Sequence, residues 1–205
     1  MNRTPIPQPI SEQRLIAVMR RLGAEHVHAV TPILVDAGVS VFEVTMDGEE
    51  ALQSIEWLAG RGYLVGAGTV RTAGDAAAAM RAGASFASSP GLDQTVLGTA
   101  ATLGLPMIPG ALTPSEIMAA WSAGSGAVKL FPASLGGHEY LRALRGPLAD
   151  IPLIPTGGVT SDNAASYLES GATAVAVGRW LTGHTDMYQI AQRATALVDS
   201  ISHLR

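Results

Sequence analysis

The chain has 205 residues, of which 47% are hydrophobic and 15% charged, and its formal net charge is −4. This composition describes a globular chain with a substantial core and argues against extended disorder. The basic residues are scattered, so no basic stripe favours a nucleic acid or an anionic membrane as a partner. Because the chain has no cysteine, disulfides, thiolate catalysis and cysteine-ligated metals are excluded.

The N-terminal residues 1–8 contain prolines and polar residues instead of the apolar core of a signal peptide. No apolar run in the chain approaches the length of a transmembrane helix. We therefore expect a soluble, cytoplasmic protein that does not bind membranes.

Short apolar runs alternate along the chain with helical segments rich in alanine and leucine, which is the βα pattern of a parallel sheet. The predicted strands are 15–19, 40–45, 63–67, 86–88, 106–108, 127–130, 153–155 and 173–177. The predicted helices are 25–37, 50–59, 74–82, 93–103, 114–120, 139–144, 162–169 and 187–197. Eight such units are the number that a closed parallel barrel needs.

An open, doubly wound α/β sheet is the rival architecture. It would place a glycine-rich dinucleotide-binding loop after the first strand, and residues 19–23, Met-Arg-Arg-Leu-Gly, do not form one. The prediction is therefore an α/β protein with a single (β/α)8 TIM barrel domain over residues 1–205, in which residues 1–13 are an N-terminal extension.

Polar residues at strand ends are the candidates for function, because the functional face of such a barrel lies at the carboxyl ends of its strands. Lys129 is the most informative of them, since its apolar neighbours predict burial and a buried ammonium must lose its proton or find a partner. A neutral lysine amine can attack a ketone and form an imine. Taken alone, Lys129 is better explained as a lysine at a strand end that reaches solvent or binds phosphate than as an imine-forming residue.

Glu43 lies inside another apolar strand, where a carboxylate also requires a partner or a proton. If the faces that carry Glu43 and Lys129 both point into the barrel, the carboxylate and the amine meet at its mouth. Considered on the pair alone, acid–base chemistry and a structural ion pair are equally good explanations.

The loops after the last two strands predict an anion site. Residues 155–159, Pro-Thr-Gly-Gly-Val, offer backbone N–H groups, and residues 177–180 add Gly178 and the Arg179 guanidinium. A glycine pair by itself is equally typical of a simple turn. The histidines, including His26, His28 and His184, show no spacing that predicts a metal site, and His184 is expected to be exposed.

Several phrases together resemble one family, the 2-keto-3-deoxy-6-phosphogluconate (KDPG) and 4-hydroxy-2-oxoglutarate (KHG) aldolases, over residues 15–181. The phrases are FEVT at 42–45, VGAGTV at 65–70, SPG at 89–91, IPG at 108–110, VKLFPA at 128–133 and PTGG at 155–158.

The resemblance implies a homotrimeric class I aldolase that needs no metal or cofactor. Its partner would be a small-molecule 2-keto acid: a 2-keto-3-deoxy-6-phospho sugar acid, of the KDPG or 6-phosphogalactonate (KDPGal) type, that is cleaved to pyruvate and glyceraldehyde 3-phosphate. Lys129 then matches the Schiff-base lysine, and Glu43 matches the general acid–base. The remaining residues implied to bind substrate are Arg20, Thr69, Pro90, Phe131, Thr156, Gly157, Gly158, Gly178 and Arg179.

Two positions depart from the family pattern. Asp47 stands where many relatives carry an arginine that holds the substrate, and Arg20, similar to an arginine of the KDPGal branch, is expected to compensate. Arg179 stands where a serine is common. Two alternatives stay open: a KHG aldolase that yields pyruvate and glyoxylate, with Arg179 meeting a carboxylate, and a phosphosugar-binding isomerase or non-catalytic barrel that forms no imine.

Overall fold

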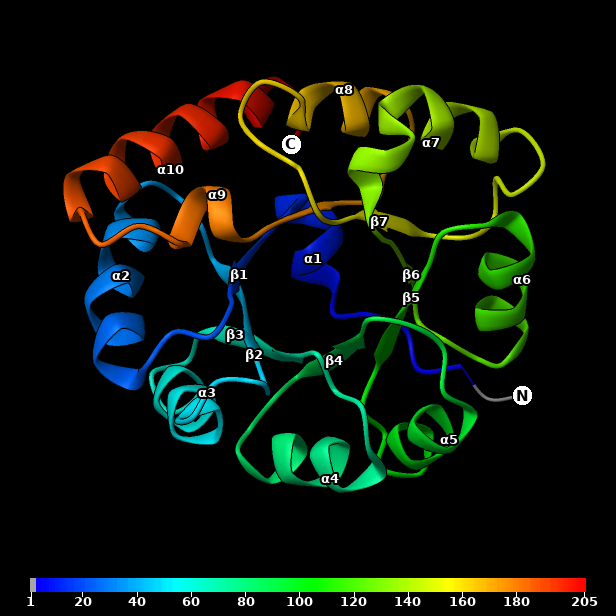
Figure 1. Ribbon diagram of the computed structural model, residues 1–205, viewed down its shortest axis with the longest axis horizontal. Helices are drawn as coiled ribbons and strands as arrows, with labels where there is room; N and C mark the ends of the chain where they lie inside the picture. Colours follow the sequence, from blue (N-terminus) through cyan, green and yellow to red (C-terminus); the bar gives the residue numbers. More distant parts are fainter. Residues whose placement is uncertain (1–2) are drawn as a thin grey trace.

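The computed structural model describes residues 3–205 as a barrel of parallel strands surrounded by helices (Figure 1). The strands are β1 (Leu15–Met19), β2 (Val41–Thr45), β3 (Leu64–Gly68), β4 (Phe86–Ser89), β5 (Met107–Ala111), β6 (Val128–Leu130), β7 (Leu153–Pro155) and β8 (Val175–Val177). They pair in the order β7-β6-β5-β4-β3-β2-β1-β8. A parallel bridge between Thr156 and Ala176 joins the two ends of this sheet, so the barrel is nearly closed.

Helices form the outer ring. They are α2 (Ala24–Asp36), α3 (Ala51–Ala59), α4 (Ala73–Arg81), α5 (Gln94–Thr102), α6 (Pro114–Ser122), α7 (Gly137–Arg145), α8 (Ala164–Glu169), the short α9 (Arg179–Thr182) and α10 (Met187–Ile201). Two short 3-10 helices are also present: η1 (Ala133–Leu135) follows β6, and η2 (Ser202–Leu204) follows α10. No helix within residues 3–205 has the length and apolar character needed to cross a membrane.

The predicted single-domain (β/α)8 barrel is confirmed. Each predicted strand and helix is present, and the largest shift of an end is at α10, which continues to Ile201 instead of stopping at residue 197. The short helix α9, which follows β8 and begins at Arg179, was not predicted.

The strands are buried on both faces, which is why their sequences are almost continuously apolar. On β2, Phe42 and Val44 point outward and pack in the cluster beneath the helices. Val41 points inward and belongs to a second cluster, with Ile16, Phe86 and Ile108, that fills the barrel interior. The alternation therefore places Glu43 on the inward face, between Val41 and Thr45.

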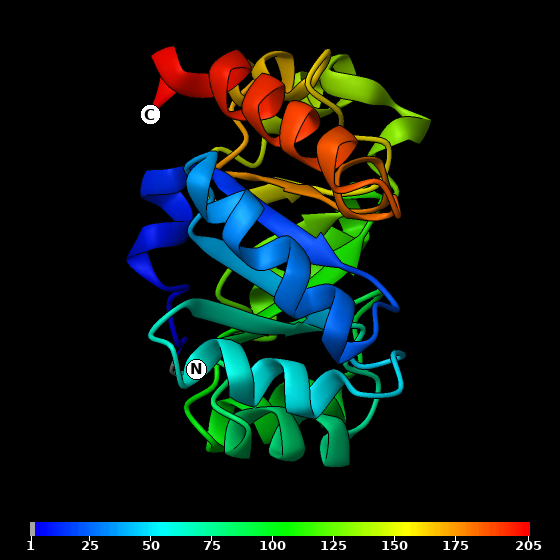
Figure 2. The ribbon, with the colours of Figure 1, turned by 90° about the vertical axis from the view of Figure 1, so that its left-hand side faces the viewer.

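The N-terminal segment is part of the fold. Residues 1–13 were predicted as an extension; of these, residues 1–2 lie outside the described residues, and Gln8–Gln13 form the helix α1. Helix α1 lies across the end of the barrel from which the strands start (Figures 1 and 2), and its Ile10 is fully buried in the interior cluster. The helix closes this end, so the barrel interior opens toward the carboxyl ends of the strands.

Candidate active site

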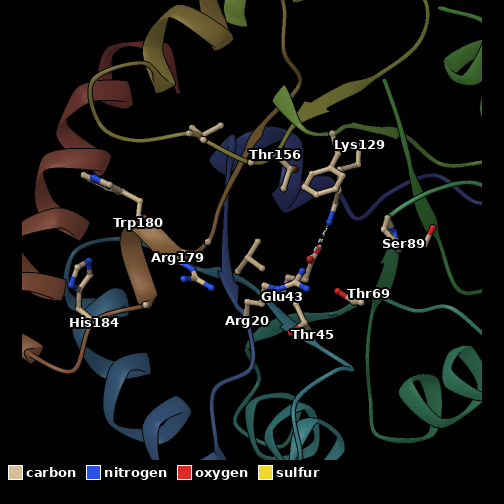
Figure 3. Close-up of a pocket in the computed structure, with 18 residues that line it drawn as sticks. Arg20, Glu43, Thr45, Thr69, Ser89, Lys129, Thr156, Arg179, Trp180 and His184 are labelled. Atoms are coloured by element: carbon tan, nitrogen blue, oxygen red, sulfur yellow. Dashed lines mark hydrogen bonds and ion pairs between the residues drawn. The ribbon is translucent and has the colours of Figure 1, made fainter. Parts of the chain in front are cut away.

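A pocket of about 590 Å³ opens at the carboxyl ends of the strands (Figure 3). Its volume is in the range of small-molecule sites. Every residue proposed for the site from the sequence lines it: Arg20, Glu43, Thr69, Pro90, Lys129, Phe131, Thr156, Gly157, Gly158, Gly178 and Arg179. It is also lined by residues that the sequence analysis did not select: Val18, Thr45, Ser89, Val159, Trp180, Gly183 and His184.

Lys129 and Glu43 form a buried ion pair within this pocket. Lys129 Nζ lies 3.0 Å from Glu43 Oε1 and 3.2 Å from Oε2, and the two residues are 7% and 1% exposed. They come from β6 and β2, and their side chains point toward one another (Figure 3). The amine and the carboxylate therefore meet in the pocket, as the sequence led us to expect.

Lys129 is also the single lysine of the chain, because the remaining residues in its total of 13 Lys and Arg are arginines. Arginine stays protonated in proteins, whereas lysine can become a neutral nucleophile. The only side chain able to form an imine therefore lies at the bottom of the pocket, a signal that the sequence analysis did not use.

Ser88 completes the contacts of this pair. Its hydroxyl donates to Glu43 Oε2 at 2.8 Å and accepts from Lys129 Nζ at 2.7 Å, and the residue is fully buried on β4. Ser88 was not predicted from the sequence, although the neighbouring phrase at 89–91 was. The feature that could have identified Ser88 is the alternation of side chains along β4, which puts Ser88 on the same inward face as Phe86.

Small residues make room for the carboxylate. A Cβ on Gly68 would overlap the Glu43 side chain, lying 2.9 Å from its carboxyl carbon. Directly after Gly68, Thr69 adopts a positive φ of 57°, a conformation that costs free energy in residues other than glycine. The end of β3 is therefore shaped around Glu43, with Thr69 at the pocket wall.

The loop after β7, which is predicted to bind an anion, has an unusual backbone. Gly157 and Gly158 have φ values of 89° and 83°, and a Cβ on Gly158 would lie 2.6 Å from Ser134 Cβ. Within residues 3–205, neither glycine N–H has a hydrogen-bond acceptor. Successive free N–H groups in such a loop can bind an anion.

Two arginines of the pocket, Arg20 and Arg179, follow the adjacent strands β1 and β8, and β8 lies next to β7. Arg20 donates to Asp47 Oδ2 at 2.9 Å, and Arg21 Nε donates to the same oxygen at 2.9 Å. Burial raises the pKa of Asp47, but a hydrogen bond with Thr45 and the two arginines outweigh it, so the net pKa is lowered. Asp47 therefore holds Arg20 in place.

Arg179, in contrast, forms no ion pair with any residue in the described part of the chain, 3–205. His184, from the loop after α9, lines the pocket near it and is half-buried in contact with Arg193, so its expected exposure was wrong. No three His, Asp or Glu side chains within residues 3–205 are grouped in a way that could hold a metal ion.

The sequence model of the KDPG and KHG aldolases matches residues 6–195 of this chain. The chain belongs to the KDPG and KHG aldolase family. The protein is thus an aldolase, which is a lyase. It is 34% identical to a probable 2-dehydro-3-deoxy-6-phosphogalactonate aldolase of Rhizobium meliloti (strain 1021), over 84% of both chains.

Solved structures of this family share the fold. One described as native KDPGal has a TM-score of 0.86 and 30% identity, covering 92% of this chain and 94% of its own. A KDPG aldolase from Legionella pneumophila, with pyruvate captured at low pH as a covalent carbinolamine, has a TM-score of 0.78 and 29% identity, covering 95% and 96%. That aldolase therefore binds pyruvate covalently.

We predict that Gly68→Ala reduces aldolase activity by tenfold or more without unfolding the protein. The added methyl group would displace the Glu43 carboxylate from its contact with Lys129. Steady-state kinetics and circular dichroism measure the two effects. Gly98→Ala is the matched control, since a Cβ there meets nothing within 4 Å and favours helix α5. Full activity of Gly68→Ala would contradict this account of the pocket.

Proposed function

We propose that this aldolase cleaves a 2-keto-3-deoxy-6-phospho sugar acid, of the KDPG or KDPGal type, to pyruvate and glyceraldehyde 3-phosphate through an imine on Lys129. The observation that carries this proposal is the buried contact between Lys129 Nζ and the Glu43 carboxylate at 3.0 Å. A nucleophilic amine and a group that accepts and returns protons are the two parts that this chemistry requires.

Imine formation begins when the Lys129 ammonium gives one proton to the Glu43 carboxylate. The amine nitrogen then adds to the keto carbon, a C–N bond forms, and the carbonyl π electrons move to oxygen. Glu43 protonates that oxygen, and the excess proton on nitrogen returns to Glu43. A further proton from Glu43 expels the oxygen as water and leaves a cationic imine, with Glu43 ionised again.

In the cleavage step, Glu43 takes the proton of the C4 hydroxyl. The C3–C4 bond breaks, its electrons move toward the imine nitrogen to give an enamine, and the aldehyde leaves. Glu43 then returns the proton to C3 of the enamine, and water hydrolyses the pyruvyl imine. The cationic nitrogen accepts the electrons of the broken bond, so we propose that no metal or other cofactor takes part.

The remaining pocket residues are proposed to bind the two ends of the substrate. Thr69 would contact the pyruvyl carboxylate, and Pro90 and Phe131 would form the walls around it. The phosphate would lie against the other side of the pocket, at Thr156, Gly157, Gly158 and Gly178. The positive φ values of Gly157 and Gly158 and their N–H groups, which have no acceptor within residues 3–205, support this assignment, because successive free N–H groups in such a loop can bind an anion.

The charges at the mouth support an anionic tail on the substrate. Arg20 shares Asp47 with Arg21, and Arg179 has no ion-pair partner within residues 3–205, so the arginines exceed the nearby carboxylates. Arg179 equally suits a carboxylate, which keeps KHG cleavage to pyruvate and glyoxylate as the second candidate. A phosphosugar isomerase or a non-catalytic barrel would not need the buried Lys129 and Glu43. A homotrimeric assembly and a cytoplasmic location are proposed on the family resemblance.

Borohydride reduction in the presence of pyruvate is predicted to add one pyruvyl group to Lys129. Since the chain has one lysine, the N-terminal amine is the only competing primary amine, and peptide mass spectrometry separates the two. Lys129→Arg keeps the charge but cannot form the imine, so it should acquire no adduct. An unmodified Lys129 peptide in the wild-type protein would overturn the proposed function.

Arg179→Gln is predicted to lower kcat/KM for KDPG or KDPGal by tenfold to about a hundredfold, mainly through KM, because one charged hydrogen-bond donor to the phosphate is lost. Activity on KHG, measured in parallel, separates the two candidates. A larger loss on KHG than on the phosphorylated substrates would favour the KHG reaction. Arg61→Gln is the control, since Arg61 is exposed and stacks on Trp57 away from the pocket.

A further inference from the structure

Ser88 bridges the two groups of the proposed reaction, beside their direct contact. The shortest of the contacts of Lys129 Nζ is that to Ser88 Oγ, at 2.7 Å, against 3.0 and 3.2 Å to the two carboxylate oxygens. The same hydroxyl has its own proton directed at Glu43 Oε2, 2.8 Å away. An unbroken chain of hydrogen bonds thus runs from the amine through Ser88 to the carboxylate.

We propose that Ser88 is a catalytic proton relay between Lys129 and Glu43, a role that rests on the imine mechanism proposed above. A proton moves from Lys129 Nζ to Ser88 Oγ while the hydroxyl proton of Ser88 moves to Glu43 Oε2. The net change is one proton from the ammonium to the carboxylate, and Ser88 remains a neutral hydroxyl. After the amine has added to the keto carbon, the same path returns the excess proton on nitrogen to Glu43.

The geometry suits a relay because Ser88 is fixed while both partners are long side chains. Its backbone belongs to β4, paired with β5 through the register of Ser88 with Ile108, and the residue is fully buried. Glu43 must serve the nitrogen of Lys129 and also the oxygen and carbon atoms of the substrate. A hydroxyl between the two carries the nitrogen's proton while the carboxylate stays directed at the substrate.

Other buried serines of the chain show that burial alone does not produce such contacts. Ser54 on α3 is fully buried, and its hydroxyl has no hydrogen-bond partner within residues 3–205. Ser88 instead uses its hydroxyl as donor and as acceptor at once, with two charged partners. Hydrogen bonds to charged groups are stronger than those between neutral groups, so these two contacts hold the Ser88 hydroxyl against the ion pair.

The test is the rate at which pyruvate forms the borohydride-trappable adduct on Lys129, followed by rapid quenching between pH 6 and 9. We expect Ser88→Ala to form it about tenfold more slowly at pH 7, a smaller loss than that of a whole acid–base group because the direct contact with Glu43 remains. The deficit should shrink as the pH rises, since hydroxide then removes the proton. Substrate KM should stay unchanged.

Two further variants make the result decisive. Ser88→Thr retains a hydroxyl on a side chain that suits a strand, so it should restore the rate, and Ser54→Ala should match the wild type. A Ser88→Ala rate equal to wild type, a deficit that is constant with pH, or a Ser88→Thr variant as slow as Ser88→Ala would overturn the relay. If the wild-type protein itself forms no adduct, the imine mechanism fails and the relay with it.

Discussion

The burial of Lys129 against Glu43 is the constraint around which the rest of the structure is arranged. Removing an ammonium and a carboxylate from water costs several kcal/mol each, and their attraction offsets this cost only when the geometry and the further hydrogen bonds are good. The single lysine of the chain is placed in this position, 7% exposed, with a carboxylate and a hydroxyl within 3.2 Å. Apolar residues of similar size would fill the space at less cost, which points to function as the reason for the pair.

The barrel makes this contact possible by bringing distant segments to one end. Glu43, Ser88 and Lys129 come from β2, β4 and β6, and each lies on the inward face of its strand. Helix α1 covers the opposite end and buries Ile10 in the interior cluster, while the pocket lies where the strands finish. Glycines provide the space within, as Gly68 does beside the Glu43 carboxylate. The proposed chemistry therefore depends on the alternation of side chains along the strands.

Much of this arrangement could be predicted from the sequence because it follows local rules. The apolar runs predicted the strands, and their period of two predicted that Glu43 and Lys129 meet if the faces that carry them point inward. The glycine phrases identified the loop at Gly157 and Gly158. These features depend on residues close together in the chain. Contacts between distant segments, such as that of Asp47 with Arg20, depend on the packed geometry.

The features that were missed have the same explanation. Ser88 is one of many serines, and its importance comes from two charged partners that are 41 and 45 residues away in sequence. Helix α1 has only six residues and begins directly after Pro7, so no periodic signal identified it. His184 was expected to be exposed because nothing near it in the sequence indicates Arg193 as a partner. Each would need knowledge of the fold before the residues could be interpreted.

The exchange of the methyl protons of pyruvate in D₂O, followed by NMR, tests most directly whether the Lys129–Glu43 pair works as proposed. The enzyme should exchange these protons through the enamine, and Glu43→Gln should slow the exchange by about 10²- to 10⁴-fold, since the group that moves the C3 proton is lost. Exchange by Glu43→Gln at the wild-type rate, or no exchange by the wild type, would contradict the account.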